Sequence, residues 1–474
     1  MLFAPASLCY NTPVHFLWRY NAVLPKEAGS AQKLMKKKSV LLAAAAVIWS
    51  LSAVFPAMAF PQNAAMAPSA AQSAIAVEIT TGNGTGNSLQ KENGWQAAAL
   101  KVTDETGVIA AEDGSGQVKV RGNSTAAGEK KPYNIKFSEK TDLFGFGKAK
   151  TYCLLANCFD PTLMRNTLAL GLAQKMGLPC TTEYRVAEVT MDGVYKGCYL
   201  LTEKVEAGKD RVDVDAGKGE FLIECERDRV EDGVTYVTAG GEFRFSLTEP
   251  EVPTAEQLSA IQTVLDGAFA AAKSNDTAEI EKYFDMDSFA KFYLLNEYFK
   301  GLDFAYSSTN FFYKDGKLYA GPIWDYDLSS GNVSQELYPG YYGGGTGISY
   351  ANAVCAQCWF KYLLKNHEFC RRVQDAFGEY QSDMRNVFEA GGRIDTEAVS
   401  FGEAFRKNYA PVSEGGAGWE AGKRYSELQR APEKTMEENV SVMKEWFKNR
   451  LGWLTAVIEN GKLADEADKC LWIH

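Results

Sequence analysis

Residues 309–327 read TNFFYKDGKLYAGPIWDYD, and the pattern of this stretch predicts the fold around it. Two runs of β-forming residues flank Asp315-Gly316, a dipeptide typical of a two-residue hairpin turn. If the residues on either side of that turn pair, Asn310 faces Gly321 on the returning strand. The sequence therefore predicts a β-hairpin with a defined register.

Polar side chains gather at one end of this predicted hairpin. Asp303 precedes it, Asn310 starts its first strand, and Asp325 follows its second strand. Carboxylate and amide oxygens at one place suit a hard cation such as Mg²⁺, which takes few protein oxygens and leaves positions for phosphate. A loop Asp, an Asn and a later Asp also follow the order of a kinase site. Asp327 is a second metal-ligand candidate, which the sequence does not separate from Asp325.

Two other interpretations of these acids remain open. In the first, Asp303 caps a turn and Asp325 and Asp327 form an Asx-turn, so that all three are structural. In the second, Asp325 and Asp327 are the carboxylate pair of a glycosidase. We rank the glycosidase below the metal site.

The rest of the chain divides into a strand-rich part and a helical part. Short β-forming runs separated by turn residues fill residues 75–250, and one helix is predicted over 161–176 with Asp160 as its N-cap. Residues 254–460 have helical periodicity, which begins at a capping box on Thr254. We predict an α+β fold with a β-rich N-terminal lobe and a mainly helical C-terminal lobe.

Composition disfavours several classes of function. The 474 residues carry a formal net charge of −10, whereas nucleic-acid partners require a basic face. Only three histidines occur, which disfavours a histidine zinc site or a Ser-His-Asp triad. Cys355 and Cys358 have C-x-x-C spacing without a second pair to complete a zinc site, so we expect a structural disulfide or free thiols.

The N-terminus has the order of a secretory signal. Residues 35–59 hold a basic cluster, a short apolar run and a small-x-small end, so we expect cleavage after Ala59 and no stable membrane span afterwards. We expect the true start at Met35, which makes residues 1–34 a mis-assigned extension. The segments that follow are an Ala/Pro/Ser-rich linker (60–74), the folded domain (75–460) and a C-terminal tail (461–474).

These motifs resemble those of the CotH kinase family, which is named for a spore-coat protein. That family carries a W-D-x-D-x-x-x-G signature after an Asp…Asn-aromatic hairpin, matched here by Trp324, Asp325, Asp327 and Gly331. Three upstream blocks follow the family pattern in the same order, through Arg121, Gly122, Ser124, Lys131, Tyr133 and Lys136; through Asp160, Arg165 and Asn166; and through Gly193, Tyr195, Gly197, Tyr199, Glu203 and Val205. The resemblance covers residues 76–460.

The resemblance implies an atypical protein-kinase-like fold, with two lobes around ATP and Mg²⁺- or Mn²⁺-dependent phosphorylation of protein Ser or Thr. It implies that Asp303 is the catalytic Asp, and that Asn310 and Asp325, with Asp327 as the rival of Asp325, bind metal. It also implies that Glu203 and Val205 lie in the hinge near adenine.

Three basic residues are further nucleotide candidates, each with a plain alternative. Lys136 projects from a strand and is placed to meet phosphate, or it is a solvated strand lysine. Arg121 precedes a small polar turn suited to phosphate, or that turn is only part of the surface. Arg165 contacts phosphate or forms an ion pair.

The sequence thus predicts an exported kinase that transfers the γ-phosphoryl group of ATP to Ser or Thr of a secreted, surface or spore-coat protein. The alternative is a non-catalytic surface or structural binding protein that reuses the fold. The G-x-G-x-x-G-x-V, V-A-I-K, H-R-D and D-F-G motifs of ordinary kinases are absent from the sequence, as an atypical member would lead us to expect.

Overall fold

The computed structural model describes residues 73–227, 229–338 and 358–468. The expected leader, the extension before it, nearly all of the linker, Cys355 and the last residues of the tail lie outside these ranges. Among the helices within them, none combines the length and apolar character needed to cross a membrane.

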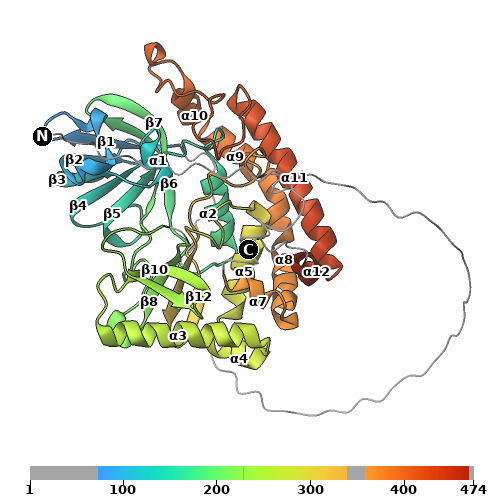
Figure 1. Ribbon diagram of the computed structural model, residues 1–474. Helices are drawn as coiled ribbons and strands as arrows, with labels where there is room; N and C mark the ends of the chain where they lie inside the picture. The colour runs from blue at the N-terminus through green and yellow to red at the C-terminus, as the bar shows by residue number, and fades with distance from the viewer. Residues whose placement is uncertain (1–72, 228, 339–357, 469–474) are drawn as a thin grey trace, which may run out of the picture. The chain divides into compact units, whose positions relative to one another are not determined.

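The first part of the described chain forms a closed barrel of seven strands (Figure 1). Their order is β1-β2-β3-β4-β5-β7-β6, and a parallel pairing of β1 with β6 closes the ring. Side chains alternate between the two faces of each strand, so that Tyr133, Ile135 and Phe137 of β4 are buried. The strands are β1 (Ile75–Thr81), β2 (Gln96–Thr103), β3 (Ile109–Val120), β4 (Tyr133–Asp142), β5 (Lys148–Leu155), β6 (Tyr184–Met191) and β7 (Val194–Glu203).

A second, antiparallel sheet has the order β12-β11-β8-β10-β9. Its hairpin has the predicted register, because Lys314 pairs with Lys317 and the Gly321 N–H donates to the Asn310 carbonyl (3.0 Å). The hairpin comes from the helical part of the chain and yet pairs with β8 of the strand-rich part. The strands are β8 (Phe221–Cys225), β9 (Tyr236–Ala239), β10 (Phe243–Glu249), β11 (Asn310–Lys314) and β12 (Lys317–Ala320).

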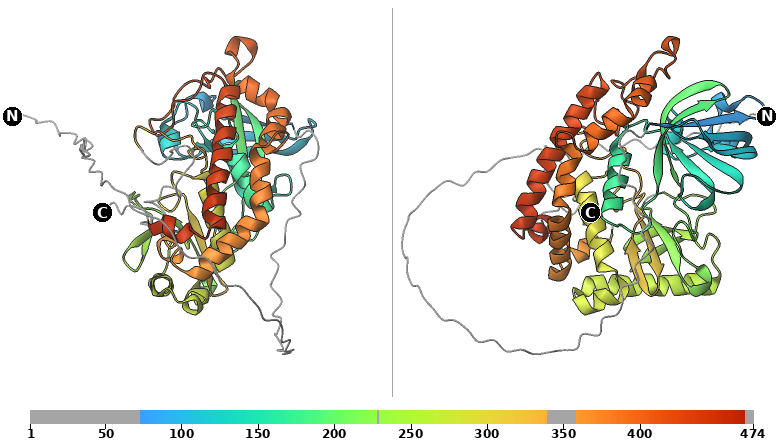
Figure 2. Two further views of the ribbon diagram at one scale, coloured as in Figure 1. Left: turned by 90° about the vertical axis from the view of Figure 1, so that its right-hand side faces the viewer. Right: turned by 180° about the vertical axis from the view of Figure 1, so that it is seen from behind.

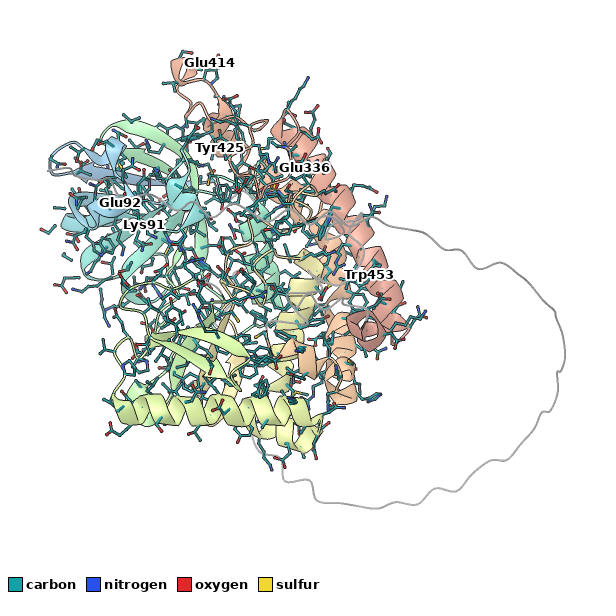
Figure 3. The ribbon with its side chains drawn as sticks, viewed as in Figure 1. Lys91, Glu92, Glu336, Glu414, Tyr425 and Trp453 are labelled. Carbon is teal, nitrogen blue, oxygen red and sulfur yellow. The ribbon has the colours of Figure 1, made fainter. Side chains whose placement is uncertain are left out.

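Helices make up most of the rest. α5 (Met286–Phe299) is apolar on nearly every face and is buried beside α8 (His367–Phe388) and α11 (Met436–Glu459). Figure 2 shows α11 running alongside α8, and Trp453 of α11 lies on the side away from the barrel (Figure 3). Other helices in the described ranges are α1 (Ser124–Ala127), α2 (Arg165–Lys175), α3 (Ala255–Ser274), α4 (Thr277–Tyr283), α7 (Phe360–Leu363), α9 (Arg393–Ser400), α10 (Gly402–Tyr409) and α12 (Leu463–Asp468).

Aromatic side chains join the second sheet to the helices. Phe311 of β11 stacks on Phe289 of α5, with ring centroids 5.4 Å apart. Phe245 of β10 stacks on Trp359, just before α7, with centroids 5.5 Å apart. All four rings are fully buried, so the hairpin is held by packing as well as by its backbone pairing.

The α+β class, with a β-rich first part and a helical second part, is confirmed. Closure of the barrel was not predicted, because pairing between β1 and β6 joins residues about a hundred positions apart in sequence.

The capping box at Thr254 is confirmed. The helix predicted over 161–176 begins only at Arg165, so Asp160 is not its N-cap. Asp160 instead forms an Asx-turn, in which its carboxylate accepts from the Thr162 N–H (2.9 Å).

The stacking of Phe311 leads to a stability prediction. Phe311→Ala should lower the free energy of unfolding by about 3–5 kcal/mol, because it opens a cavity between β11 and α5. Phe311→Leu should cost less, because it fills part of that volume. Urea unfolding followed by fluorescence measures both, and equal small losses would contradict a tightly packed hairpin.

Candidate active site

Two of the predicted acids line one pocket. Asp303 and Asp325 both line it, together with Ser308 and Trp324, and Phe292 and Asn296 of α5 line it as well. The Ser308 hydroxyl donates to the Asp325 carboxylate (3.3 Å). The hairpin therefore brings together carboxylates that lie 22 positions apart in sequence.

The backbone around this pocket is strained. Ala305, Ser308 and Asp325 all have positive φ, at 61°, 50° and 67°. Non-glycine residues seldom adopt this conformation, and such strain clusters at functional sites. Hydrogen bonds compensate for it, since the Thr309 hydroxyl accepts from the Ala305 N–H (2.9 Å) and the Asp303 carbonyl accepts from two N–H groups.

The loop that carries Asp325 is held by α2, which lies between the barrel and the other helices (Figure 1). The Asn166 side-chain oxygen accepts from the Tyr326 N–H (2.8 Å). Arg165 forms a buried ion pair with Asp160 and donates to the Ser329 carbonyl (3.0 Å). The structure thus shows the ion pair for Arg165, whose side chain also holds the loop.

Burial is the main cause of the raised pKa values of the acids, and repulsion between the carboxylates adds to it at Asp303 and Asp327. Burial, followed by the charge of Asp325, raises the pKa of Asp303 to about 7. Burial and Asp325 also raise the pKa of Asp327 well above its ordinary value. Burial raises the pKa of Asp325 as well, against the opposing charge of Arg121 and hydrogen bonds from Ser308 and Asp327. The buried site therefore disfavours the charged forms of all three acids.

The closeness of Asp325 and Asp327 bears on the glycosidase interpretation. The two carboxyl groups hydrogen-bond to each other, and Asp327 is almost completely buried. A glycosidase pair needs a separation of about 5 Å or more to admit the sugar. This geometry argues against a glycosidase.

Two further acids stand beside the site, and the sequence reasoning missed them. Glu224 lies on β8, Glu226 follows the last residue of that strand, and Asn310 pairs directly with Glu224. The Glu224 carboxyl accepts from the Ser308 N–H, and burial with Glu226 and Asp325 raises its pKa to about 7. The alternation Glu-Cys-Glu was visible in a predicted strand. The sequence does not indicate that this strand, β8, pairs with the hairpin.

The barrel supplies positive charge next to the acids. Arg121, just after β3, places its guanidinium over the Trp324 ring, 5.2 Å from the ring centroid. Lys119 and Lys136 both lie over Trp95, with their ammonium groups 4.7 and 5.6 Å from its ring centroid. Burial lowers the pKa of Lys119, and the neighbouring charges of Lys204, Lys136 and Arg121 lower it further.

An unsatisfied acceptor lies among these cations. The Asn134 side-chain oxygen is buried and has no hydrogen-bond partner within the described residues. Asn134 shares a strand face with Lys136 and pairs with Lys119 across the ladder. Neighbouring positive charges and an unpaired acceptor are expected where a protein binds an anionic ligand that also has hydrogen-bond donors.

Three other predicted residues are placed elsewhere. The Asn310 amide donates to the Pro322 carbonyl (3.2 Å), so that it holds the returning strand. Glu203 forms a buried ion pair with Arg211 and accepts from the Glu183 N–H (2.7 Å). Val205 packs against a small cluster that contains Val212 and Phe312. Among the described residues that line the acidic pocket, none of these three side chains appears.

The acidic pocket contains possible ligands for a metal ion. Within the described ranges, no three His, Cys, Asp or Glu side chains are grouped so as to hold a metal ion. The donors that are present, carboxylates with a neighbouring hydroxyl, are nevertheless hard oxygen ligands of the kind that Mg²⁺ takes one or two at a time beside substrate phosphates. The acids therefore fit a cation that arrives with a nucleotide.

Comparison with known proteins assigns the chain to a family. No curated protein matches its sequence. The family model described as CotH kinase protein matches residues 118–454, which include Arg121, Asp303, the hairpin and both acids of the W-D-x-D motif. The chain belongs to the CotH kinase family.

Proposed function

We propose that this protein is an exported kinase of the CotH type, which transfers the γ-phosphoryl group of ATP to Ser or Thr of a secreted, surface or coat protein. The observation that carries the proposal is the meeting of Asp303 and Asp325 in one pocket, with Arg121 of the barrel beside them. Family membership makes the protein kinase-like. The substrate, the export and the two-lobed arrangement around ATP are parts of the proposal.

Asp303 is our candidate for the catalytic Asp. It lines the pocket next to Asp325, and its pKa of about 7 suits a base that works near neutral pH. In this role its carboxylate orients the substrate hydroxyl and accepts its proton. The N–H groups of Tyr306 and Ser307 donate to its carbonyl (both 2.9 Å) and hold its loop in place.

Asp325 is our preferred metal ligand, with Asp327 behind it. Asp325 lines the pocket, whereas Asp327 is buried and its raised pKa favours the protonated form. A bound Mg²⁺ or Mn²⁺ would neutralise charge on the transferring phosphate. Asn310 stays a predicted ligand, although in this structure its amide hydrogen-bonds to Pro322.

The basic face of the barrel is our proposed nucleotide site. Arg121 and Lys136 are joined there by Lys119, and the free acceptor of Asn134 suits a ligand N–H or O–H. Crowded cations favour a triphosphate, since its charge offsets their repulsion. The end of β7 and the residues after it, with Glu203 and Val205, remain the proposed hinge beside adenine, where backbone groups would make the contacts.

The alternative function is a surface or structural binding protein without catalysis. The expected leader supports export in both cases, and both take a protein partner and no nucleic acid. The two differ in whether the pocket binds a nucleotide and transfers its phosphate. That difference is measurable on the purified full chain.

The first prediction concerns Asp303. Asp303→Asn should lower phosphotransfer by about 100-fold or more, because the base is lost, while the thermal shift on adding Mg²⁺-ATP is retained. Incorporation of labelled phosphate into the protein itself or a generic Ser/Thr substrate measures the rate. Asp315→Asn, at the turn of the same hairpin, is the matched control and should leave it unchanged. A wild type with neither phosphate transfer nor a nucleotide-dependent shift would favour the binding protein.

The second prediction separates Asp325 from Asp327. Asp325→Asn should abolish the Mg²⁺-dependent part of nucleotide binding, and chelation of divalent cations should do the same in the wild type. Asp327→Asn should weaken Mg²⁺-dependent nucleotide binding less, because the amide of Asn and the protonated carboxyl of Asp327 are both uncharged and similar in size. Nucleotide affinity measured with and without Mg²⁺ tests this order, and a stronger loss from Asp327→Asn would reverse the assignment.

The third prediction follows from the pKa of Asp303 of about 7, which is raised from 3.8. A raised carboxyl pKa means that folding favours the protonated form, so its stability contribution is present below pH 4 and is lost as pH rises through 7. Without divalent cations, the Tm of Asp303→Asn relative to wild type should therefore rise between pH 4 and pH 7 and level off above. A flat difference across that range would contradict the shifted pKa.

A further inference from the structure

Two cysteines from distant parts of the chain lie side by side next to the site. Cys225 is the last residue of β8, and Cys358 stands just before Trp359 and α7. Their sulfur atoms are 3.7 Å apart, although the residues are separated by 133 positions in sequence. Both side chains are almost completely buried, and both are thiols in the structure.

The position of Cys225 connects this pair to the site. Cys225 lies between Glu224 and Glu226, and its N–H donates to the Thr309 carbonyl (2.8 Å) of the loop that starts at Asp303. Cys358 is beside Trp359, whose ring stacks on Phe245 of the neighbouring strand β10. A covalent link here would tie the acidic strand to the start of the helix packed behind it.

We propose that Cys225 and Cys358 form a disulfide that fastens β8 to the start of α7. The two thiols lose two protons and two electrons as the S–S bond forms. A disulfide oxidant, either a small-molecule disulfide or the oxidised dithiol of a thiol oxidoreductase, takes up those electrons and is reduced to two thiols. The bond requires the sulfurs to approach from 3.7 Å to about 2.05 Å, and the fold already brings the two residues together.

Burial determines when such a bond would form. Removal from water raises the pKa of Cys225 well above its ordinary value, and the thiolate is the form that reacts. The bond therefore forms as the chain folds, before β8 is covered. Once formed, it is shielded from reductants by the same packing.

The pairing differs from that suggested by the C-x-x-C spacing of Cys355 and Cys358. Cys355 lies outside the described residues, so only Cys358 of that motif is placed. A bond from Cys358 to Cys225 closes a loop of more than a hundred residues and constrains the unfolded chain far more than a bond to Cys355 would. The two pairings are distinguished by peptide mapping.

The experiment refolds the full chain in a buffer of oxidised and reduced glutathione, blocks free thiols, and maps disulfides by mass spectrometry after proteolysis. A peptide linking Cys225 to Cys358 is the expected result. A Cys355–Cys358 link, or blocked thiols at both Cys225 and Cys358, would overturn the proposal. This readout does not depend on catalysis, so it stands apart from any failure of the kinase proposal.

A second measurement tests the consequence for stability. Refolding with excess reductant should lower the Tm by on the order of 5–10 °C, because the long loop is no longer closed. Cys225→Ala and Cys358→Ala should each abolish that dependence on reductant. Cys198→Ala, at a buried thiol of β7, is the matched control and should keep it. Reductant sensitivity unchanged in Cys225→Ala would contradict the assigned pair.

Discussion

The pairing of β11 with β8 is the contact on which the site depends. It joins a hairpin from the helical part of the chain to a strand from the strand-rich part, and it sets Asn310 opposite Glu224. Because the register of the hairpin is fixed as well, Asp325 returns to the level of the loop that starts at Asp303. A slip of one residue would turn every side chain of β11 to the other face and would disperse the acids. Packing of Phe311 on Phe289 holds the hairpin in that place.

The second organising feature is the imbalance of charge. Burial and mutual repulsion raise the pKa values of Asp303, Asp327 and Glu224, so the acids are forced together at an electrostatic cost. The barrel carries the opposite excess, in Arg121 and the lysines around Trp95. A bound metal ion would offset the negative charge of the acids, and the polyphosphate bound with it would offset the positive charge of the barrel. Perturbed acids in a pocket are a recognised mark of functional sites, and the strained backbone at Asp325 agrees with that reading.

The loop that carries Asp325 shows how a structural residue can resemble a binding residue. Arg165 was a phosphate candidate because its charge and its motif fitted that role. Its guanidinium is instead buried against Asp160 and the Ser329 carbonyl. Asn166, its neighbour in the same motif, accepts from the Tyr326 N–H. Arg165 and Asn166 therefore bind backbone groups of the loop that carries Asp325 and hold that loop in its strained conformation.

The sequence by itself determined the local features: the turn at Asp315-Gly316, the hairpin register, the capping box at Thr254 and the α+β division, since each depends on neighbouring residues. The family resemblance was equally readable, because its motifs are short and occur in order. Only the tertiary structure decided the barrel closure, the place of Glu224, the contact of Cys225 with Cys358 and the burial of Arg165. These features join segments far apart in the chain, and which partners meet is set by packing of the whole core, which no local pattern encodes.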